Sequence, residues 1–323
     1  MTTFKEIRGT LIKSLSSDPS PVANGEMWYN STSQTLKGQL LVGAWASGGN
    51  MNTARSQIAG FGIQTAAIYA GGYAYGPNSY QNASEEYNGS AWTSTPNMPV
   101  TLGFRVPAGT TAAGLASAGH DGSSPNNTSE WDGSGWTNGG NVNNGGYGAI
   151  GSGSQTAAFI VGSSEPPNRP NTQTEEYNGS AWTVVPGTLN TGRGNGSSSG
   201  SQTDGIYSGG APSSTLSENY NGTVWAGGAT LITGMNRSAA SGGTAPSNSV
   251  MIAGSASTTT VVQETDGTSW FAATSLGTGR SPQSAGGAGA SASSSLVAGG
   301  NNPSITATEE FTTAAATKTF TTS

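Results

Sequence analysis

Short apolar runs that end in glycine recur along a chain that is otherwise rich in small polar residues. In residues 66–72, for example, Ala-Ala-Ile-Tyr-Ala leads directly into Gly-Gly. The runs do not alternate strictly between apolar and polar, which is typical of strands buried on both faces. Such runs occupy residues 66–72, 114–119, 157–162, 205–210, 250–254 and 295–300.

A second pattern follows each apolar run. Residues Glu85–Trp92 read Glu-Glu-Tyr-Asn-Gly-Ser-Ala-Trp, and the motif returns almost letter for letter at Glu175–Trp182. Asn-Gly is a strong signal for a two-residue hairpin, because a type I′ turn needs positive φ at both central residues. We therefore expect Tyr87 and Trp92 to lie on neighbouring strands joined by Asn88-Gly89. The equivalent aromatic positions are Tyr87, Trp131, Tyr177, Tyr220, Thr265 and Phe311, at intervals of 43 to 46 residues.

A third pattern, an arginine upstream of the apolar run, completes the repeat. The third repeat has no such arginine and reads Val-Asn-Asn-Gly-Gly-Tyr at residues 142–147. A unit of this length cannot bury its faces alone, so we expect the six units to pack into an array that closes on itself. The arginines are Arg55, Arg105, Arg193, Arg237 and Arg280.

This order of motifs resembles the kelch repeat, in which an apolar strand ends in paired glycines and is followed by Tyr and then Trp. The resemblance covers roughly residues 45–320, although the paired glycine is complete only at Gly71-Gly72, Gly209-Gly210 and Gly299-Gly300. It implies an all-β fold, a kelch-like β-propeller. Six repeats predict six blades, or seven if the N-terminal region adds one. Residues 36–45 and 317–320 read as further strands, one of which would complete the closing blade.

Residues 1–37 differ from the repeats, and we interpret them as a docking segment ahead of a propeller at residues 38–323. Residues Gly25–Lys37 read as a β-hairpin. Their pattern, Gly-Glu-x-Trp-Tyr-Asn-x-Thr followed by Leu-Lys, resembles segments of structural and tail proteins of marine and cyanobacterial tailed phages. That resemblance implies a virion protein whose N-terminal segment binds other virion proteins. The docking residues would be Phe4, Ile7, Leu11, Trp28 and Tyr29.

Composition argues against several classes of function. The net charge is −6, the sequence pI is about 4.7 and no basic cluster occurs, so we expect no nucleic-acid partner. The chain has no cysteine and no apolar stretch long enough to insert into a membrane. With one histidine, His120, it offers neither a Ser-His-Asp constellation nor a histidine pair for a metal. We therefore expect no catalytic residue, metal or cofactor.

Two sets of residues are candidates for ligand binding. The five arginines could form a positive ring at the central channel that holds a sulfate, phosphate or uronic acid group. The interpretation we favour is that each arginine makes inter-blade hydrogen bonds. The glutamate pairs 85/86, 175/176 and 309/310 recur with the repeat, so we expect them to pair with the arginines rather than to catalyse.

The second set lies in the longest loops, which follow the apolar strands of the first three repeats. Exposed aromatic side chains on loops over a rigid scaffold can stack on sugar rings, whereas neutral sequence drift is the plainer alternative. The set consists of Tyr73, Tyr75, Tyr80, His120, Asp121 and Arg169.

These observations favour a non-enzymatic virion protein made in the host cytoplasm. It would be a tail-fibre, tail-tip or surface-decoration component that displays a propeller, with host-surface glycans as its candidate ligand. One alternative is a propeller-based glycan-degrading enzyme, which would need a unique cluster of carboxylate, tyrosine or histidine at the channel mouth. The other is a generic protein-interaction module, which an adaptor domain would support.

Overall fold

The computed structural model describes residues 12–164, 172–240, 250–254, 259–280, 286–300 and 303–320. Throughout these residues the fold is all-β, and no helix is long and apolar enough to cross a membrane. The chain divides into two compact units, Met1–Ala44 with Thr313–Ser323, and Trp45–Thr312. The boundary that we expected after residue 37 falls inside strand β3 (Thr35–Ser47), which runs through both units.

The larger unit is built from small antiparallel sheets in chain order. Sheet 1 consists of β4 (Ala59–Ile63), β5 (Ala66–Ala70), β8 (Ser84–Tyr87) and β9 (Trp92–Thr95). Sheet 2 consists of β10 (Val106–Thr110), β11 (Ala113–Ser117), β12 (Thr128–Trp131) and β13 (Trp136–Asn138). Sheet 3 consists of β14 (Ile150–Ser154), β15 (Ala157–Val161), β16 (Thr174–Tyr177) and β17 (Trp182–Val185).

The remaining sheets repeat this order. Sheet 4 consists of β18 (Ser197–Ser201), β19 (Asp204–Ser208), β20 (Ser217–Tyr220) and β21 (Trp225–Gly227). Sheet 5 consists of β22 (Ala239–Ala240), β23 (Val250–Ala253), β24 (Val262–Thr265) and β25 (Trp270–Ala272). Sheet 6 begins with β26 (Gly286–Ser291), β27 (Ser294–Ala298) and β28 (Thr308–Phe320), and β3 takes the fourth position; two further strands of the smaller unit continue the sheet to six strands.

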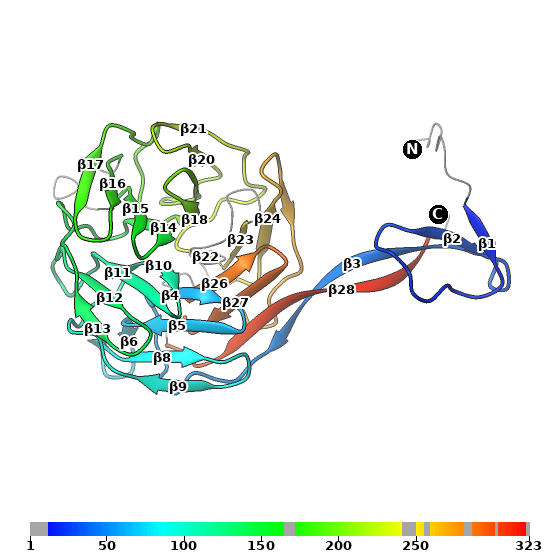
Figure 1. The fold of residues 1–323 in the computed structure, drawn as a ribbon, viewed down its shortest axis with the longest axis horizontal. Coiled ribbons are helices and arrows are strands. Elements are labelled where there is room, and N and C mark those ends of the chain that lie inside the picture. Colours follow the sequence, from blue (N-terminus) through cyan, green and yellow to red (C-terminus); the bar gives the residue numbers. More distant parts are fainter. Residues whose placement is uncertain are drawn as a thin grey trace. The chain divides into compact units, whose positions relative to one another are not determined.

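The first strands of the sheets lie side by side. Each contacts the first strand of the next sheet in chain order, and β26 of sheet 6 contacts β4 of sheet 1. Figure 1 shows the sheets fanning outward from these strands. The predicted apolar runs form the second strand of every sheet, and in β5 only the first residue is not buried. Their prediction as buried strands is confirmed.

The turn after the glutamate–aromatic strand differs from the sequence prediction. Tyr87 pairs directly with Trp92, so the loop has four residues and is not a two-residue type I′ turn. Only Gly89 has a positive φ, of 89°. The Asn88 side chain supplies the missing order, because its Oδ1 accepts hydrogen bonds from the backbone N–H groups of Ser90 and Ala91 at 3.0 and 2.9 Å. Asparagine and aspartate side chains often stabilise turns by accepting hydrogen bonds from the backbone two or three residues on, so this loop does not need a second residue with positive φ.

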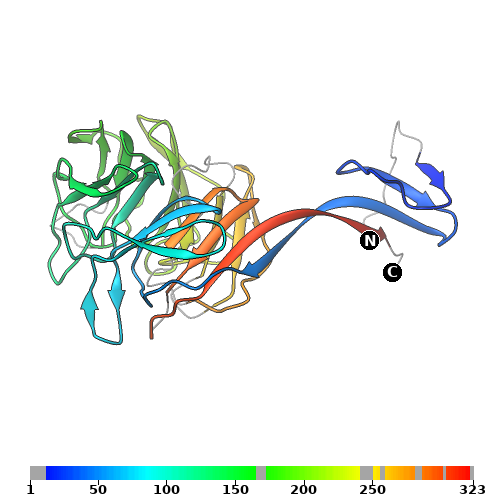
Figure 2. The same cartoon turned by 60° about the horizontal axis from the view of Figure 1, so that its bottom comes forward.

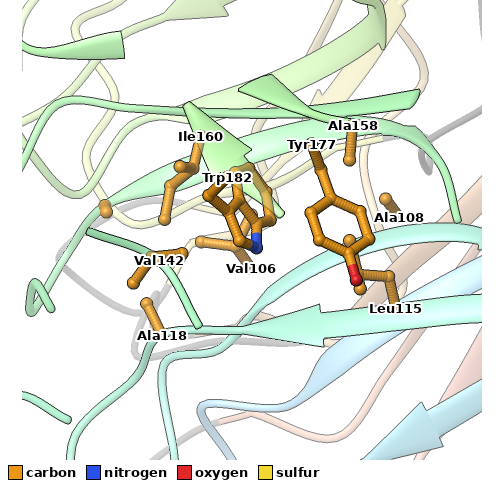
Figure 3. Packing of buried hydrophobic residues seen from close by; sticks show 10 residues of the cluster. Val106, Ala108, Leu115, Ala118, Val142, Ala158, Ile160, Tyr177 and Trp182 are labelled. Atoms are coloured by element: carbon orange, nitrogen blue, oxygen red, sulfur yellow. The ribbon is translucent and has the colours of Figure 1, made fainter. Parts of the chain in front are cut away.

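Neighbouring sheets are joined by the repeated aromatic residues. Tyr177 and Trp182 of sheet 3 pack on Val106, Ala108 and Leu115 of sheet 2, as Figure 3 shows. The tryptophan indole also donates to a threonine hydroxyl of the preceding sheet. These pairs are Trp92 with Thr308 at 2.9 Å, Trp182 with Thr128 at 3.0 Å and Trp225 with Thr174 at 2.9 Å.

The second glutamate of two pairs, 175/176 and 309/310, and Glu130 at the equivalent position of sheet 2 join sheets in the same way. Tyr220 of sheet 4 donates its hydroxyl to Glu176 of sheet 3 at 2.8 Å. Tyr177 donates to Glu130 of sheet 2, and burial together with this acceptor raises the pKa of Tyr177 to about 12. These glutamates therefore bind tyrosines of the next sheet and not the arginines.

The smaller unit contains β1 (Lys13–Leu15), which lies parallel to β2 (Met27–Asn30), and β2 pairs antiparallel with β3. The predicted hairpin at residues 25–37 is thus confirmed. Asp18 organises it, because its carboxylate accepts from the Trp28 indole at 2.9 Å, from Asn30 at 2.8 Å and from Lys37 at 2.8 Å. These bonds, of which the Lys37 bond is the largest, lower the pKa of Asp18 to about 2.

Candidate functional site

Three of the candidate arginines are structural. Arg55, Arg193 and Arg280 are almost fully buried, and each makes an ion pair with the first glutamate of its own repeat. The guanidinium groups also donate to backbone carbonyls, as Arg55 does to Gly71 and Ala83 at 2.6 and 2.7 Å. The ion pairs are Arg55–Glu85 at 2.8 Å, Arg193–Glu218 at 2.6 Å and Arg280–Glu309 at 3.1 Å.

The five arginines therefore do not form one ring. The first glutamate neutralises its arginine, as expected for Glu85 and Glu309, whereas Glu175 has no such arginine in its repeat. The bonds lie within one repeat and not between repeats, because the arginine precedes the first strand of the same sheet that holds its glutamate. For these three arginines this corrects the favoured inter-blade interpretation, whereas Arg237 does bond a residue of another repeat.

Arg105 and Arg237 occupy different positions from these three. Counted from the buried residue that begins each segment, Arg55 follows Met51 by four residues, but Arg105 follows Met98 by seven and Arg237 follows Leu231 by six. Among the described residues, neither arginine makes an ion pair with a carboxylate. The positions equivalent to the paired arginine and glutamate hold Leu102 with Ser129 in sheet 2 and Met235 with Gln263 in sheet 5.

Arg105 is 4% exposed and only part of its guanidinium is satisfied. Its Nη2 donates to the carbonyls of Ala116 and Asn127, whereas Nε and Nη1 have no hydrogen-bond acceptor among the described residues. Burial lowers the pKa of Arg105 to about 9, because no carboxylate offsets the loss of hydration.

Arg237 is half-buried and lies among aromatic rings. Its Nη2 donates to the Tyr147 hydroxyl at 2.6 Å, and its guanidinium carbon lies 5.8 Å from the ring centres of both Phe104 and Tyr147. Its Nε is buried without an acceptor among the described residues.

Both of these arginines line one cavity of about 130 Å³ beside the first strands of the sheets. Equivalent residues of five repeats line it, each with a left-handed backbone: Gln57, Phe104, Gly148, Asn195 and Arg237, with φ of 57°, 55°, 72°, 57° and 58°. No aspartate or glutamate is among the described residues that line the cavity.

Next to the cavity, half-buried aromatic rings form a chain of contacts that we call the aromatic cluster. Tyr80 joins the hairpin β6–β7 (Tyr73–Ala74 and Ser79–Tyr80), which projects from the sheets in Figure 2, to His120 of the second repeat. Backbone hydrogen bonds between His120 and Gly103 hold that loop in place. The contacts, by ring centres, are Tyr73–Tyr75 at 4.9 Å, Tyr73–Tyr80 at 5.0 Å, Tyr80–His120 at 5.8 Å, His120–Tyr147 at 5.0 Å and Phe104–Tyr147 at 4.6 Å.

The structure thus brings together four of the six loop residues chosen from the sequence: Tyr73, Tyr75, Tyr80 and His120. Asp121 is exposed and accepts from the Ser123 hydroxyl at 2.6 Å, which is the main reason that its pKa is lowered. Arg169 lies outside the described residues. Phe104 and Tyr147 were not among the residues predicted for the site, although both stand in the segment that precedes the first strand of their sheets.

The expected docking residues divide into three groups. Trp28 is fully buried inside the smaller unit by its own hairpin, so its side chain is not available to a partner there. Tyr29 is 38% exposed. Phe4, Ile7 and Leu11 lie outside the described residues. The same unit exposes further large apolar side chains, namely Met27, Leu40, Leu41 and Phe320.

Within the described residues, no three His, Cys, Asp or Glu side chains gather in a way that could hold a metal ion. No family model matches the chain, and no curated protein matches it. The solved structure of YjhT is similar over 83% of this chain and 99% of its own length, with a TM-score of 0.64. Sequence identity is 12%, so this likeness concerns the fold alone.

Proposed function

We propose that this chain is a non-enzymatic structural protein of a tailed-phage virion, whose larger unit is a six-bladed, kelch-like propeller that binds host-surface glycans. The six sheets are its blades, and β3 closes the ring as the outer strand of the last blade. The contact of β26 with β4 supports closure, since it joins the last sheet to the first.

The aromatic cluster carries the proposal of glycan binding. Its six rings are half-buried, lie on loops from three repeats and border a cavity. Aromatic faces held by a rigid scaffold offer the apolar C–H face of a sugar a stacking surface at little entropic cost. Nearby hydroxyl, amide and guanidinium groups, such as those of Tyr147, Asn195 and Arg237, supply polar partners for sugar hydroxyls.

The smaller unit is the docking element in this proposal. Its exposed apolar side chains, including Tyr29, Leu41 and Phe320, provide a surface that a neighbouring virion protein would cover. The virion assignment itself depends on the resemblance of the segment at residues 25–37 to phage structural proteins.

The test is binding of the purified protein to host cells and to their extracted surface polysaccharide. Tyr80→Ala removes the ring between the two halves of the cluster, and we expect it to weaken binding about two- to tenfold, because one stacked aromatic contributes about 0.5–1.5 kcal/mol. Val184→Ala, at an exposed position on β17, is the matched control. Equal binding by Tyr80→Ala would contradict the proposed site, and release of oligosaccharides from the polysaccharide would contradict the non-enzymatic assignment.

A further inference from the structure

Of the five repeat arginines, all of them among the described residues, the two without a carboxylate partner are the two that line the cavity. Arg55, Arg193 and Arg280 are neutralised inside their sheets and are not among the lining residues. Arg105 and Arg237 face no acidic side chain there. In a chain of net charge −6, the cavity is therefore a local region of positive charge.

Both guanidinium groups also retain unused donors. Nε and Nη1 of Arg105 and Nε of Arg237 are buried and have no acceptor among the described residues. A buried charged donor without a partner is costly, and a bound anion relieves this cost while it gains charge-assisted hydrogen bonds. Arg55, Arg193 and Arg280 each leave one buried nitrogen without an acceptor too, but in those repeats a glutamate neutralises the charge of the arginine.

Within the proposed function, the geometry points to an acidic sugar residue as the ligand: its carboxylate or sulfate group binds in the cavity, with Arg237 and Arg105 as donors, while its ring contacts the aromatic cluster. Arg237 links the two parts of this site, because it donates to Tyr147 and lies over both Tyr147 and Phe104. This inference rests on glycan binding and adds the chemical class of the sugar.

Arg237→Gln is the variant that tests the inference, since Arg237 is only half-buried and its replacement leaves the paired arginines intact. Isothermal titration would compare three probes: an oligoglucuronate, a sulfated dextran oligosaccharide and neutral dextran of similar length. We expect wild-type protein to bind one of the two acidic probes, with Arg237→Gln at least about tenfold weaker because a charge-assisted bond is lost. Lys318→Gln, which removes a positive charge at an exposed position of the smaller unit, should bind as wild type does.

The outcomes separate this inference from the proposed function. Preference for glucuronate identifies a carboxylate as the bound group, and preference for sulfated dextran identifies a sulfate ester. If neutral dextran binds as tightly and Tyr80→Ala weakens it, the acidic ligand is wrong while glycan binding stands. If Arg237→Gln, shown by circular dichroism to be folded, keeps wild-type affinity for the acidic probe, the assignment of the cavity is overturned. If no probe and no host polysaccharide binds, both proposals fail.

Discussion

The position of an arginine, rather than its presence, decides its role in this chain. Arg55 lies four residues after Met51 and meets Glu85, whereas Arg237 lies six residues after Leu231 and reaches the cavity. A displacement of two residues moves the guanidinium from the interior of a sheet to the lining of the cavity. Alignment of the repeats by their arginines hid this difference, and alignment by the buried residue that begins the segment would have revealed it.

A single carboxylate gives the smaller unit a dependence on pH. The pKa of Asp18 is about 2 in the folded chain, below its usual value of 3.8, because Lys37, Asn30 and Trp28 bond the charged form. Since the folded value is the lower one, the stabilisation is complete above about pH 4 and is lost as the pH falls towards 2.

We therefore expect the NMR signal of the Trp28 indole N–H to move between about pH 4 and 2 as the hairpin loosens. Asp18→Asn, which keeps an acceptor oxygen but cannot titrate, should remove this transition. A Trp28 signal that stays constant down to about pH 2 in the wild-type protein would contradict the role given to Asp18.

At the scale of the element, a sheet such as sheet 1 has both charged residues of the buried arginine–glutamate pair, and sheet 5 has neither. Sheet 5 has Met235 and Gln263 where sheet 1 has Arg55 and Glu85. The Gln263 Oε1 still accepts from the N–H groups of Ile232 and Thr233, at 2.8 and 3.1 Å, as the Glu85 carboxylate accepts from Asn52 and Thr53. The backbone bonds are thus conserved between sheets while both charges are removed together.

This comparison predicts a strong coupling between the two positions in sheet 1. Arg55→Met alone leaves Glu85 buried and unpaired and should lower the free energy of unfolding by about 3–5 kcal/mol. Adding Glu85→Gln should recover more than half of that loss, because the pair then matches the one in sheet 5. Unfolding in guanidinium chloride of Arg55→Met, Glu85→Gln and the double variant measures the coupling, and a double variant destabilised by the sum of the two single effects would refute it.

The elements themselves could largely be predicted from the sequence, but the site only in part: four of its rings were chosen from the sequence and their grouping was not foreseen. Short continuous apolar runs such as residues 66–70 are typical of strands covered on both faces, so the second strand of each sheet could be predicted. The prediction of a two-residue turn at Asn88-Gly89 was wrong, because the sequence pattern does not reveal that the Asn88 side chain accepts hydrogen bonds from its own loop. The grouping of Tyr80, His120 and Tyr147 depends on three separate repeats meeting at one cavity, which no local signal contains.

At the scale of the whole molecule, the last sheet unites strands from both ends of the chain. Trp45, near the end of β3, packs against Phe311 of β28 with ring centres 5.2 Å apart and donates its indole N–H to the Thr274 carbonyl at 2.8 Å. It therefore holds β3 both to its own sheet and to the sheet before it.

Trp45→Ala should lower the free energy of unfolding by about 2 kcal/mol, somewhat less than for a fully buried tryptophan. Phe271→Ala, at a position 45% exposed on β25, serves as the control and should change stability by no more than about 0.5 kcal/mol. Chemical denaturation followed by circular dichroism measures both, and equal effects of the two substitutions would argue against β3 as the closing strand.

The pairing of β3 with β28 also means that β3 must wait for its partner strand during synthesis. Roughly 260 residues separate the two strands, so a ribosome adding about 5–20 residues per second needs about 10–50 s between them. During that interval the nascent chain carries β3 with its backbone donors and acceptors open on the side that β28 will occupy. An unpaired strand edge can pair with the same edge of another copy, so we expect slower synthesis to increase association between nascent chains.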